Sequence, residues 1–158
     1  MIWRRPGHES SEGTRRAVST ARTERLSGGQ AATEGSPGTL LAPLEAGAYE
    51  IWYVIGSDAT VQARRPITVT AAVATLDGPD DIAHGAEFEV TWTGPNGPGD
   101  YVTIVAAGAE RWTDEPYFYT HDGNPGTLTA PDESGDHQLW YVTGQGSVVI
   151  ESVPIQVK

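Results

Sequence analysis

Short stretches in which apolar and polar residues alternate are the main structural signal in this chain. In the clearest one, residues 87–92, Phe88, Val90 and Trp92 alternate with charged or hydroxyl-bearing residues. Alternation with a period of two is typical of a β-strand that is buried on one side only. The pattern therefore predicts a half-buried strand, with the three apolar side chains facing a core.

Six further strands are predicted around it, because apolar stretches are separated by turn-forming residues. Gly and Pro total 30 residues, and the run 94–99 reads Gly-Pro-Asn-Gly-Pro-Gly. Such spacing favours an all-β, immunoglobulin-like or fibronectin type III-like β-sandwich. Pro154 predicts that the last strand lies at an edge or is bulged there. The predicted strands are 73–76, 87–92, 101–105, 117–121, 127–130, 138–142 and 148–157, and the predicted core is Phe88, Val90, Trp92, Val102, Ile104, Leu139 and Tyr141.

An internal repeat defines the domain organisation. Residues 37–70 align without a gap on residues 125–158, with 16 identities in 34 positions. The offset is about the length of one small sandwich domain. We expect one complete repeat at 71–158 and a truncated repeat at 37–70 that carries only its last three strands.

Residues 1–36 show no strand periodicity. They are rich in Arg, Ser, Gly, Ala, Thr and Glu, which offer little apolar surface to offset the entropy of ordering. We expect this segment to be disordered, or else a non-native reading of the region, such as a frameshifted or misassigned start.

Charge and composition narrow the possible partners. The whole chain has a formal net charge of −11, and residues 36–158 hold 17 acidic and four basic groups. A surface of this sign repels nucleic acid, so we expect no nucleic-acid partner. The absence of Cys excludes disulfides and thiolate metal sites. No apolar stretch is long enough to cross a membrane, and the N-terminus lacks the apolar segment of a secretory signal.

One turn predicts a tyrosine corner, in which a Tyr hydroxyl bonds back to nearby backbone. Glu45, Gly47 and Tyr49 have the expected spacing before a strand. His137 occupies the position of Tyr49 in the second repeat, and we interpret it as a substituted structural corner rather than a metal ligand or catalytic residue.

Candidate chemistry is otherwise sparse. Asp80, Asp81, Asp100, Asp114, Glu115 and Asp122 lie near expected strand ends. Structural Ca²⁺ there stays an alternative to plain solvated turns, because no Asp-x-Asp-x-Asp-Gly loop is present. No nucleophile elbow, zinc motif or phosphate loop occurs. We therefore expect no enzymatic activity and no cofactor.

Exposed aromatic residues are the candidate ligand contacts. Trp112, Tyr117 and Tyr119 lie in one aromatic stretch, and Trp140 lies elsewhere. Flat exposed rings stack on sugars, so a carbohydrate-binding module is the alternative function. Alternate members of these runs must face a core, which accounts for about half of them.

Two strings carry a family resemblance: EFEVTWTGPNGPGDYVTIVAAGA, and YFYTHDGNPGTLTAPDESGDHQLWYVTGQ. Together they resemble an immunoglobulin-like tandem repeat of bacterial exported proteins that also carry a von Willebrand factor A-type domain. The resemblance covers residues 74–157 and, as a truncated copy, 37–70. It implies an extracytoplasmic repeat used as a spacer or adhesive surface, next to further repeats, and it supplies no catalytic residues.

The expected function is thus a non-catalytic module of a larger bacterial surface or secreted protein, with an unknown protein or glycan ligand. The truncated repeat leaves apolar residues without an opposing sheet: Leu40, Tyr49, Ile51, Tyr53, Val61, Ile67 and Val69. Open edges of this kind favour pairing with another chain. We therefore expect self-association through residues 37–70.

Overall fold

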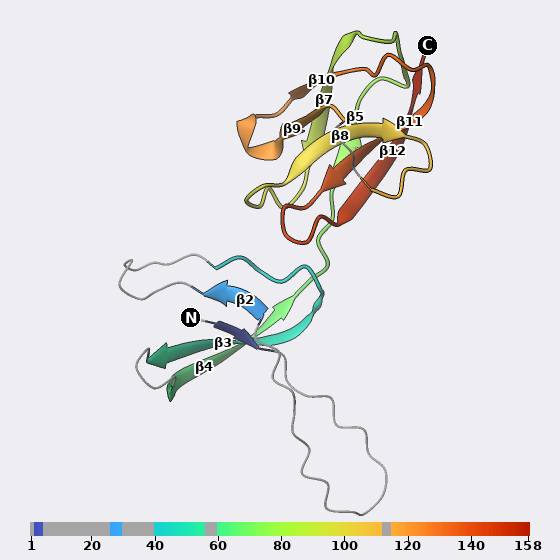
Figure 1. The fold of residues 1–158 in the computed structure, drawn as a ribbon. Coiled ribbons are helices and arrows are strands. Elements are labelled where there is room, and N and C mark those ends of the chain that lie inside the picture. The colour runs from blue at the N-terminus through green and yellow to red at the C-terminus, as the bar shows by residue number, and fades with distance from the viewer. Residues whose placement is uncertain (1, 5–25, 30–39, 56–59, 112–114) are drawn as a thin grey trace, which may run out of the picture. The chain divides into compact units, whose positions relative to one another are not determined.

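The computed structural model describes residues 2–4, 26–29, 40–55, 60–111 and 115–158. The chain divides into two compact units, residues 1–71 and 72–158, one residue from the boundary that the repeat predicts. The described residues form strands and one 3₁₀ turn, Thr120–Asp122, which confirms the all-β prediction (Figure 1). The strands are β1 (Ile2–Arg4), β2 (Leu26–Gly29), β3 (Gly47–Ile55), β4 (Thr60–Val69), β5 (Thr75–Asp77), β6 (Asp81–Ile82), β7 (Glu87–Thr93), β8 (Tyr101–Ala106), β9 (Tyr117–Tyr119), β10 (Gly126–Thr129), β11 (Gly135–Val142) and β12 (Val149–Val157).

The C-terminal unit consists of two sheets. One has the order β10-β7-β5 and the other the order β6-β12-β11-β8-β9. All neighbours are antiparallel except β6 and β12, which run parallel. The strands β8, β11 and β12 lie side by side in Figure 1, with β7 and β10 in the second layer.

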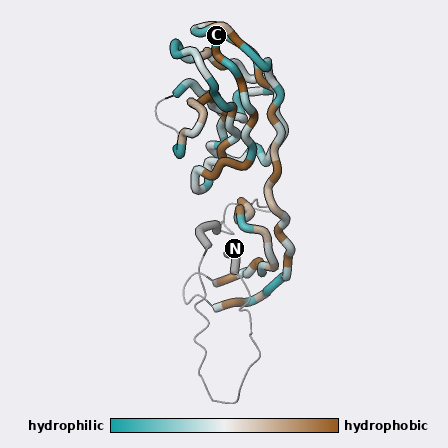
Figure 2. The backbone as a smooth tube through the Cα atoms, turned by 90° about the vertical axis from the view of Figure 1, so that its right-hand side faces the viewer, coloured by the Kyte–Doolittle hydropathy of each residue, from teal (hydrophilic) through white to brown (hydrophobic). Residues whose placement is uncertain are grey.

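The core lies between these sheets. Alternate residues of β7 are buried, as the period-two pattern predicts. All seven predicted core residues belong to a single buried cluster that draws on both sheets. Figure 2 shows the same division, with hydrophobic stretches along the strands of this unit and hydrophilic ones at its turns.

Several strand boundaries differ from the prediction by one residue, and the larger differences are at four places. The first strand begins at Thr75 rather than 73, and β6, of only two residues, is too short to show periodicity. The strand predicted at 117–121 ends at Tyr119, where the 3₁₀ turn begins. The strand β11 begins at Gly135, three residues before the predicted start at 138, and the last strand is β12.

Pro154 lies at a local sheet edge, as predicted, and not in a bulge, because β6 pairs with β12 only at Gln156 and Val157. Its strand, β12, lies between β6 and β11 with an unbroken register at this position. The amide N–H of Gln156 points to the β6 side, where it donates to Asp80 O over 2.9 Å. Since N–H directions repeat every two residues, the nitrogen of Pro154 faces that side too, before β6 begins. The proline therefore costs no bond to β11.

The N-terminal unit contains a four-stranded sheet with the order β2-β1-β3-β4. Its β3–β4 hairpin repeats the β11–β12 pair residue for residue: Tyr49 pairs with Ile67, and His137 with Ile155. Even the bulge recurs, after Tyr53 in one unit and after Tyr141 in the other. The strand β1 pairs with β3 as β8 pairs with β11.

Two expectations for this unit need correction. The segment 1–36 contains the strands β1 and β2, so its description as strand-free is wrong for those seven residues; the rest of it lies outside the described residues. The first strand expected in the truncated repeat is absent over residues 40–42. Leu40 nevertheless packs against Tyr49 and Val69, so the apolar contact survives without the strand.

Candidate binding surface

Asp100 lies at the centre of a buried polar network. It is 3% exposed and directly precedes β8, at the end of the 94–99 turn. Its Oδ2 accepts hydrogen bonds from Tyr141 Oη at 2.9 Å and from Gly97 N at 2.8 Å, and its Oδ1 accepts one from Gly144 N at 2.8 Å. A buried carboxylate requires such donors. The network ties the 94–99 turn to the 143–147 turn.

The hydrogen bonds of Asp100 bear on the hypothesis that this residue is a Ca²⁺ ligand. Asp100 was among the acidic residues considered as Ca²⁺ ligands, yet both of its oxygens are used by protein donors. Within the described ranges, no group of three or more His, Asp or Glu side chains could hold a metal ion. Asp81 pairs instead with Lys158 at 2.6 Å, and Asp122 with His121 at 3.3 Å.

The tyrosine corner is present in the first repeat and altered in the second. Tyr49 Oη donates to Glu45 O over 2.7 Å, and the side chain is 2% exposed. His137 is also buried, and its Nδ1 lies 3.1 Å from Gly135 O. The imidazole thus bonds back to the first residue of its own strand, two positions earlier, whereas the partner of Tyr49 lies four positions earlier. It borders an open depression of about 410 Å³ together with Asp80 and Asp136.

Three tyrosines form a row on the outer face of the five-stranded sheet. Tyr101 of β8 pairs in register with Tyr119 of β9, and Tyr117 lies two residues earlier on the same face. The Tyr117 ring is nearly perpendicular to both neighbours, at 71° and 5.8 Å to Tyr101 and 81° and 5.2 Å to Tyr119. His121 stacks on Tyr119 at 5.3 Å and 24°.

Local packing raises the pKa of two tyrosines in this row, Tyr101 and Tyr117. Burial, followed by the charge of Tyr119, raises the pKa of Tyr101. The hydrogen bond with Tyr119 is the main cause that raises the pKa of Tyr117. Both phenols therefore stay neutral near pH 7 and can donate as well as accept hydrogen bonds.

The row borders a pocket of about 320 Å³, which we call the tyrosine pocket. It is lined by Tyr101, Tyr117, Tyr119, Gly99, Gly144 and Ser147. A side chain at Gly144 would overlap the carbonyl oxygen of Pro98, so close packing of two turns requires glycine there. Two of the lining residues, Gly99 and Gly144, therefore offer backbone and no side chain to the pocket.

The four aromatic residues named from the sequence divide into three groups. Tyr117 and Tyr119 are 45% and 38% exposed and lie together in the tyrosine pocket. Trp140 is only 7% exposed and packs with Val105 and Val142, so it does not offer an open ring face. Trp112 lies outside the described residues. Tyr101, which the sequence analysis did not select, completes the pocket.

Trp140 has a structural role that is repeated in the N-terminal unit. Its Nε1 donates to Gln138 Oε1 at 3.1 Å, and Trp52 Nε1 donates to Glu50 Oε2 at 2.9 Å. Arg64 covers the Trp52 ring at 4.5 Å, a cation–π contact.

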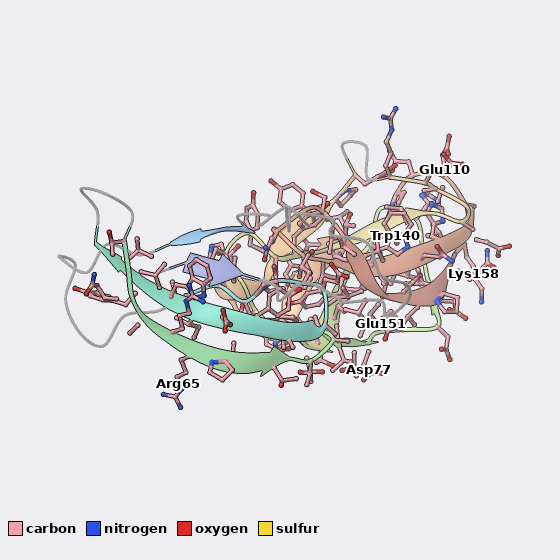
Figure 3. All side chains as sticks on the ribbon, turned by 90° about the horizontal axis from the view of Figure 1, so that it is seen from below. Arg65, Asp77, Glu110, Trp140, Glu151 and Lys158 are labelled. Carbon is pink, nitrogen blue, oxygen red and sulfur yellow. The ribbon has the colours of Figure 1, made fainter. Side chains whose placement is uncertain are left out.

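Trp140 and Glu110, both labelled in Figure 3, border a second pocket of about 190 Å³.

Comparisons with known proteins provide no assignment, since no family model, curated protein or solved structure matches this chain. Among the residues that the structure describes, no helix has the length and apolar character needed to cross a membrane.

Proposed function

We propose that this chain is a non-catalytic, immunoglobulin-like structural and interaction module of a larger bacterial surface or secreted protein, acting as a spacer or adhesive repeat. The order β12-β11-β8-β9 corresponds to the G-F-C-C′ order of immunoglobulin-like sandwiches, opposite a sheet that holds the counterparts of strands A, B and E. The matching registers of β3–β4 and β11–β12 support descent of both units from one repeat.

The parallel pair β6–β12 is the observation that carries the spacer role. The strand β6 lies near the start of the C-terminal unit, and β12 ends it. Tension on the two ends of the unit therefore pulls these strands along each other in opposite directions. Bonds across this pair must then break together rather than one by one.

Several bonds connect this pair. Gln156 N donates to Asp80 O, Lys158 N to Ile82 O and His84 N to Lys158 O, each over 2.9 Å. The exposed ion pair of Lys158 and Asp81 adds little at equilibrium. Backbone bonds that join the two ends of a module resist stretching of that module. Such resistance suits a spacer, which holds a ligand-binding part at a distance from the point where the protein is attached.

Single-molecule force spectroscopy on the full chain, held at its termini, tests this proposal. Unfolding of the 87 residues 72–158 should lengthen the chain by about 300 Å in one step. Gln156→Pro removes the amide that bonds Asp80 O, so it should lower the unfolding force while the length gain stays unchanged.

Thr127→Pro is the matched control for this experiment. It also introduces proline into a strand, but Ala130 N donates to Ala86 O, so the amide of Thr127, three residues earlier, points away from β7. Its unfolding force should stay near that of the unaltered chain. Equal forces for both proline variants, or gradual lengthening without a peak, would contradict the spacer role.

Carbohydrate recognition is a second candidate function, favoured by the tyrosine pocket. The pocket places two half-exposed tyrosines on one sheet face, beside a serine hydroxyl. One sandwich can serve as a spacer and also bind a glycan, because the tyrosine pocket and the β6–β12 pair use different strands.

A further inference from the structure

The size of the tyrosine pocket limits what it can hold. About 320 Å³ is near the lower end of small-molecule sites, which cover roughly 300–1,000 Å³. The pocket is built from two strands and two turns of the same unit, and the Asp100 network fixes the positions of both turns. A rigid site of this size fits one or two small rings rather than a long extended peptide.

The chemistry of the walls is aromatic and uncharged. The lining residues that the structure describes are three tyrosines, two glycines and a serine, with no acidic or basic side chain among them. Ring faces provide apolar contact, and the phenol and serine hydroxyls provide both donors and acceptors. A sugar ring has the complementary surfaces, since its C–H groups form an apolar face and its hydroxyls form a polar rim.

The charge of the surrounding unit selects among sugars. Residues 72–158 contain 14 acidic residues and two basic ones. Such a surface repels anionic polysaccharides such as polyuronates, and the described lining residues include no cation to offset that repulsion. The hydroxyl-rich, uncharged walls therefore fit a neutral saccharide.

We propose that the tyrosine pocket binds one ring of a neutral saccharide, with Tyr101 and Ser147 as hydrogen-bonding partners. The sugar stacks on the ring of one of two platform residues, Tyr117 and Tyr119, and contacts the nearly perpendicular ring of the other. This rests on carbohydrate recognition, the second proposed function. The sugar approaches over the outer face of the five-stranded sheet, away from the core, because Phe118, between the two platform residues, packs inward against the core cluster.

Binding to the full chain tests the proposal by nuclear magnetic resonance titration. The probes are cellohexaose, xylohexaose, mannohexaose and chitohexaose, each up to about 10 mM, ten times the Kd of a weak ~1 mM complex. At least one should shift the resonances of Tyr117, Tyr119 and Ser147. Tyr117→Ala and Tyr119→Ala should each weaken that binding about tenfold or more.

Tyr53→Ala is the matched control, because Tyr53 is as exposed as Tyr117, at 45%, but belongs to the N-terminal unit. It should leave binding unchanged. Far-ultraviolet circular dichroism shows whether each variant is folded, and Tyr119→Phe, which keeps the ring, should retain most of the affinity.

Each failure has a distinct meaning. If none of the four oligosaccharides binds, both carbohydrate recognition and this pocket's role are overturned. If one binds equally well to Tyr117→Ala and Tyr119→Ala, the chain binds sugar elsewhere, and only the assignment of the pocket is overturned. Tetramethylammonium or polygalacturonate binding at these tyrosines, without any neutral sugar, would show a cation site or an anion site instead and would also overturn it.

Discussion

Tyr141 Oη donates a hydrogen bond to Asp100 Oδ2 over 2.9 Å, although 41 positions separate the two residues. The same hydroxyl accepts the amide of Asn96 at 3.0 Å. Tyr141 and Asp100 are both buried, with 0% and 3% exposure. Two loops and a central strand thus meet at one phenol and one carboxylate, and Gly99 and Gly144 of these loops line the tyrosine pocket.

Tyr141→Phe should lower the free energy of unfolding by about 1–3 kcal/mol, because it leaves a buried carboxylate and the Asn96 amide each short of a partner. The ring stays, so packing is preserved. Chemical denaturation measures the loss. Tyr53→Phe is the control, since Tyr53 aligns with Tyr141 in the repeat but is 45% exposed, and it should change stability by under ~0.5 kcal/mol. Equal effects would show that the network adds nothing.

Stability should also fall in alkaline solution. Burial is the main cause that raises the pKa of Tyr141 from 10.0 to about 12. Between these values the unfolded chain releases the proton while the folded chain keeps it. The free energy of unfolding therefore decreases as pH rises from about 10 to about 12, and this residue adds no pH dependence below that window.

Denaturation curves at several pH values measure this decline. Tyr141→Phe should flatten it, although a smaller decline should remain because the pKa of Tyr101 is raised as well. An unchanged alkaline decline in Tyr141→Phe would mean that other groups cause it.

Trp92→Ala should cost about 3–5 kcal/mol, the range for truncating a large buried aromatic side chain. Trp92 is 9% exposed, its ring lies 5.8 Å from that of Tyr141, and its Nε1 donates to Gly123 O at 3.2 Å. The denaturation midpoint measures the effect. Val73→Ala, at a position 78% exposed, should change it by under ~0.5 kcal/mol. A midpoint unaffected by Trp92→Ala would contradict the two-layer core.

The N-terminal unit should drive self-association. Tyr53 and Ile67 are 45% and 37% exposed, whereas their counterparts in the repeat, Tyr141 and Ile155, are 0% and 3% exposed. The face that the second sheet covers in the C-terminal unit is therefore partly open here. Exposed apolar side chains on a sheet with open edges favour pairing with another copy.

Sedimentation velocity at tens of micromolar should accordingly show dimers or larger species for the full chain and monomers for residues 71–158. Combining Tyr53→Lys with Ile67→Lys should shift the full chain toward monomer, whereas Val73→Lys should not. A full chain that is monomeric without any substitution would show that this face is satisfied within the chain.

The sequence by itself determined the all-β class, the repeat offset and the core of the C-terminal unit. These depend on local alternation and on similarity between segments, both of which are visible along the chain. Phe88, Val90 and Trp92 could be placed on one buried face because a strand turns each successive side chain to the opposite side. The tyrosine corner at Tyr49 was predictable for the same reason, since its partner Glu45 lies only four residues away.

Only the tertiary structure decided which aromatic residues meet and which are covered. Trp140 and Tyr119 are both aromatic residues of predicted strands. In the structure Trp140 is buried against its neighbours, while Tyr119 lies on the edge strand β9. The Asp100–Tyr141 bond, the parallel β6–β12 pair and the inclusion of Tyr101 in the pocket all join residues distant in sequence. Alternation gives the face on which a side chain lies but not the strand beside it, so these contacts arise only when the sheets assemble.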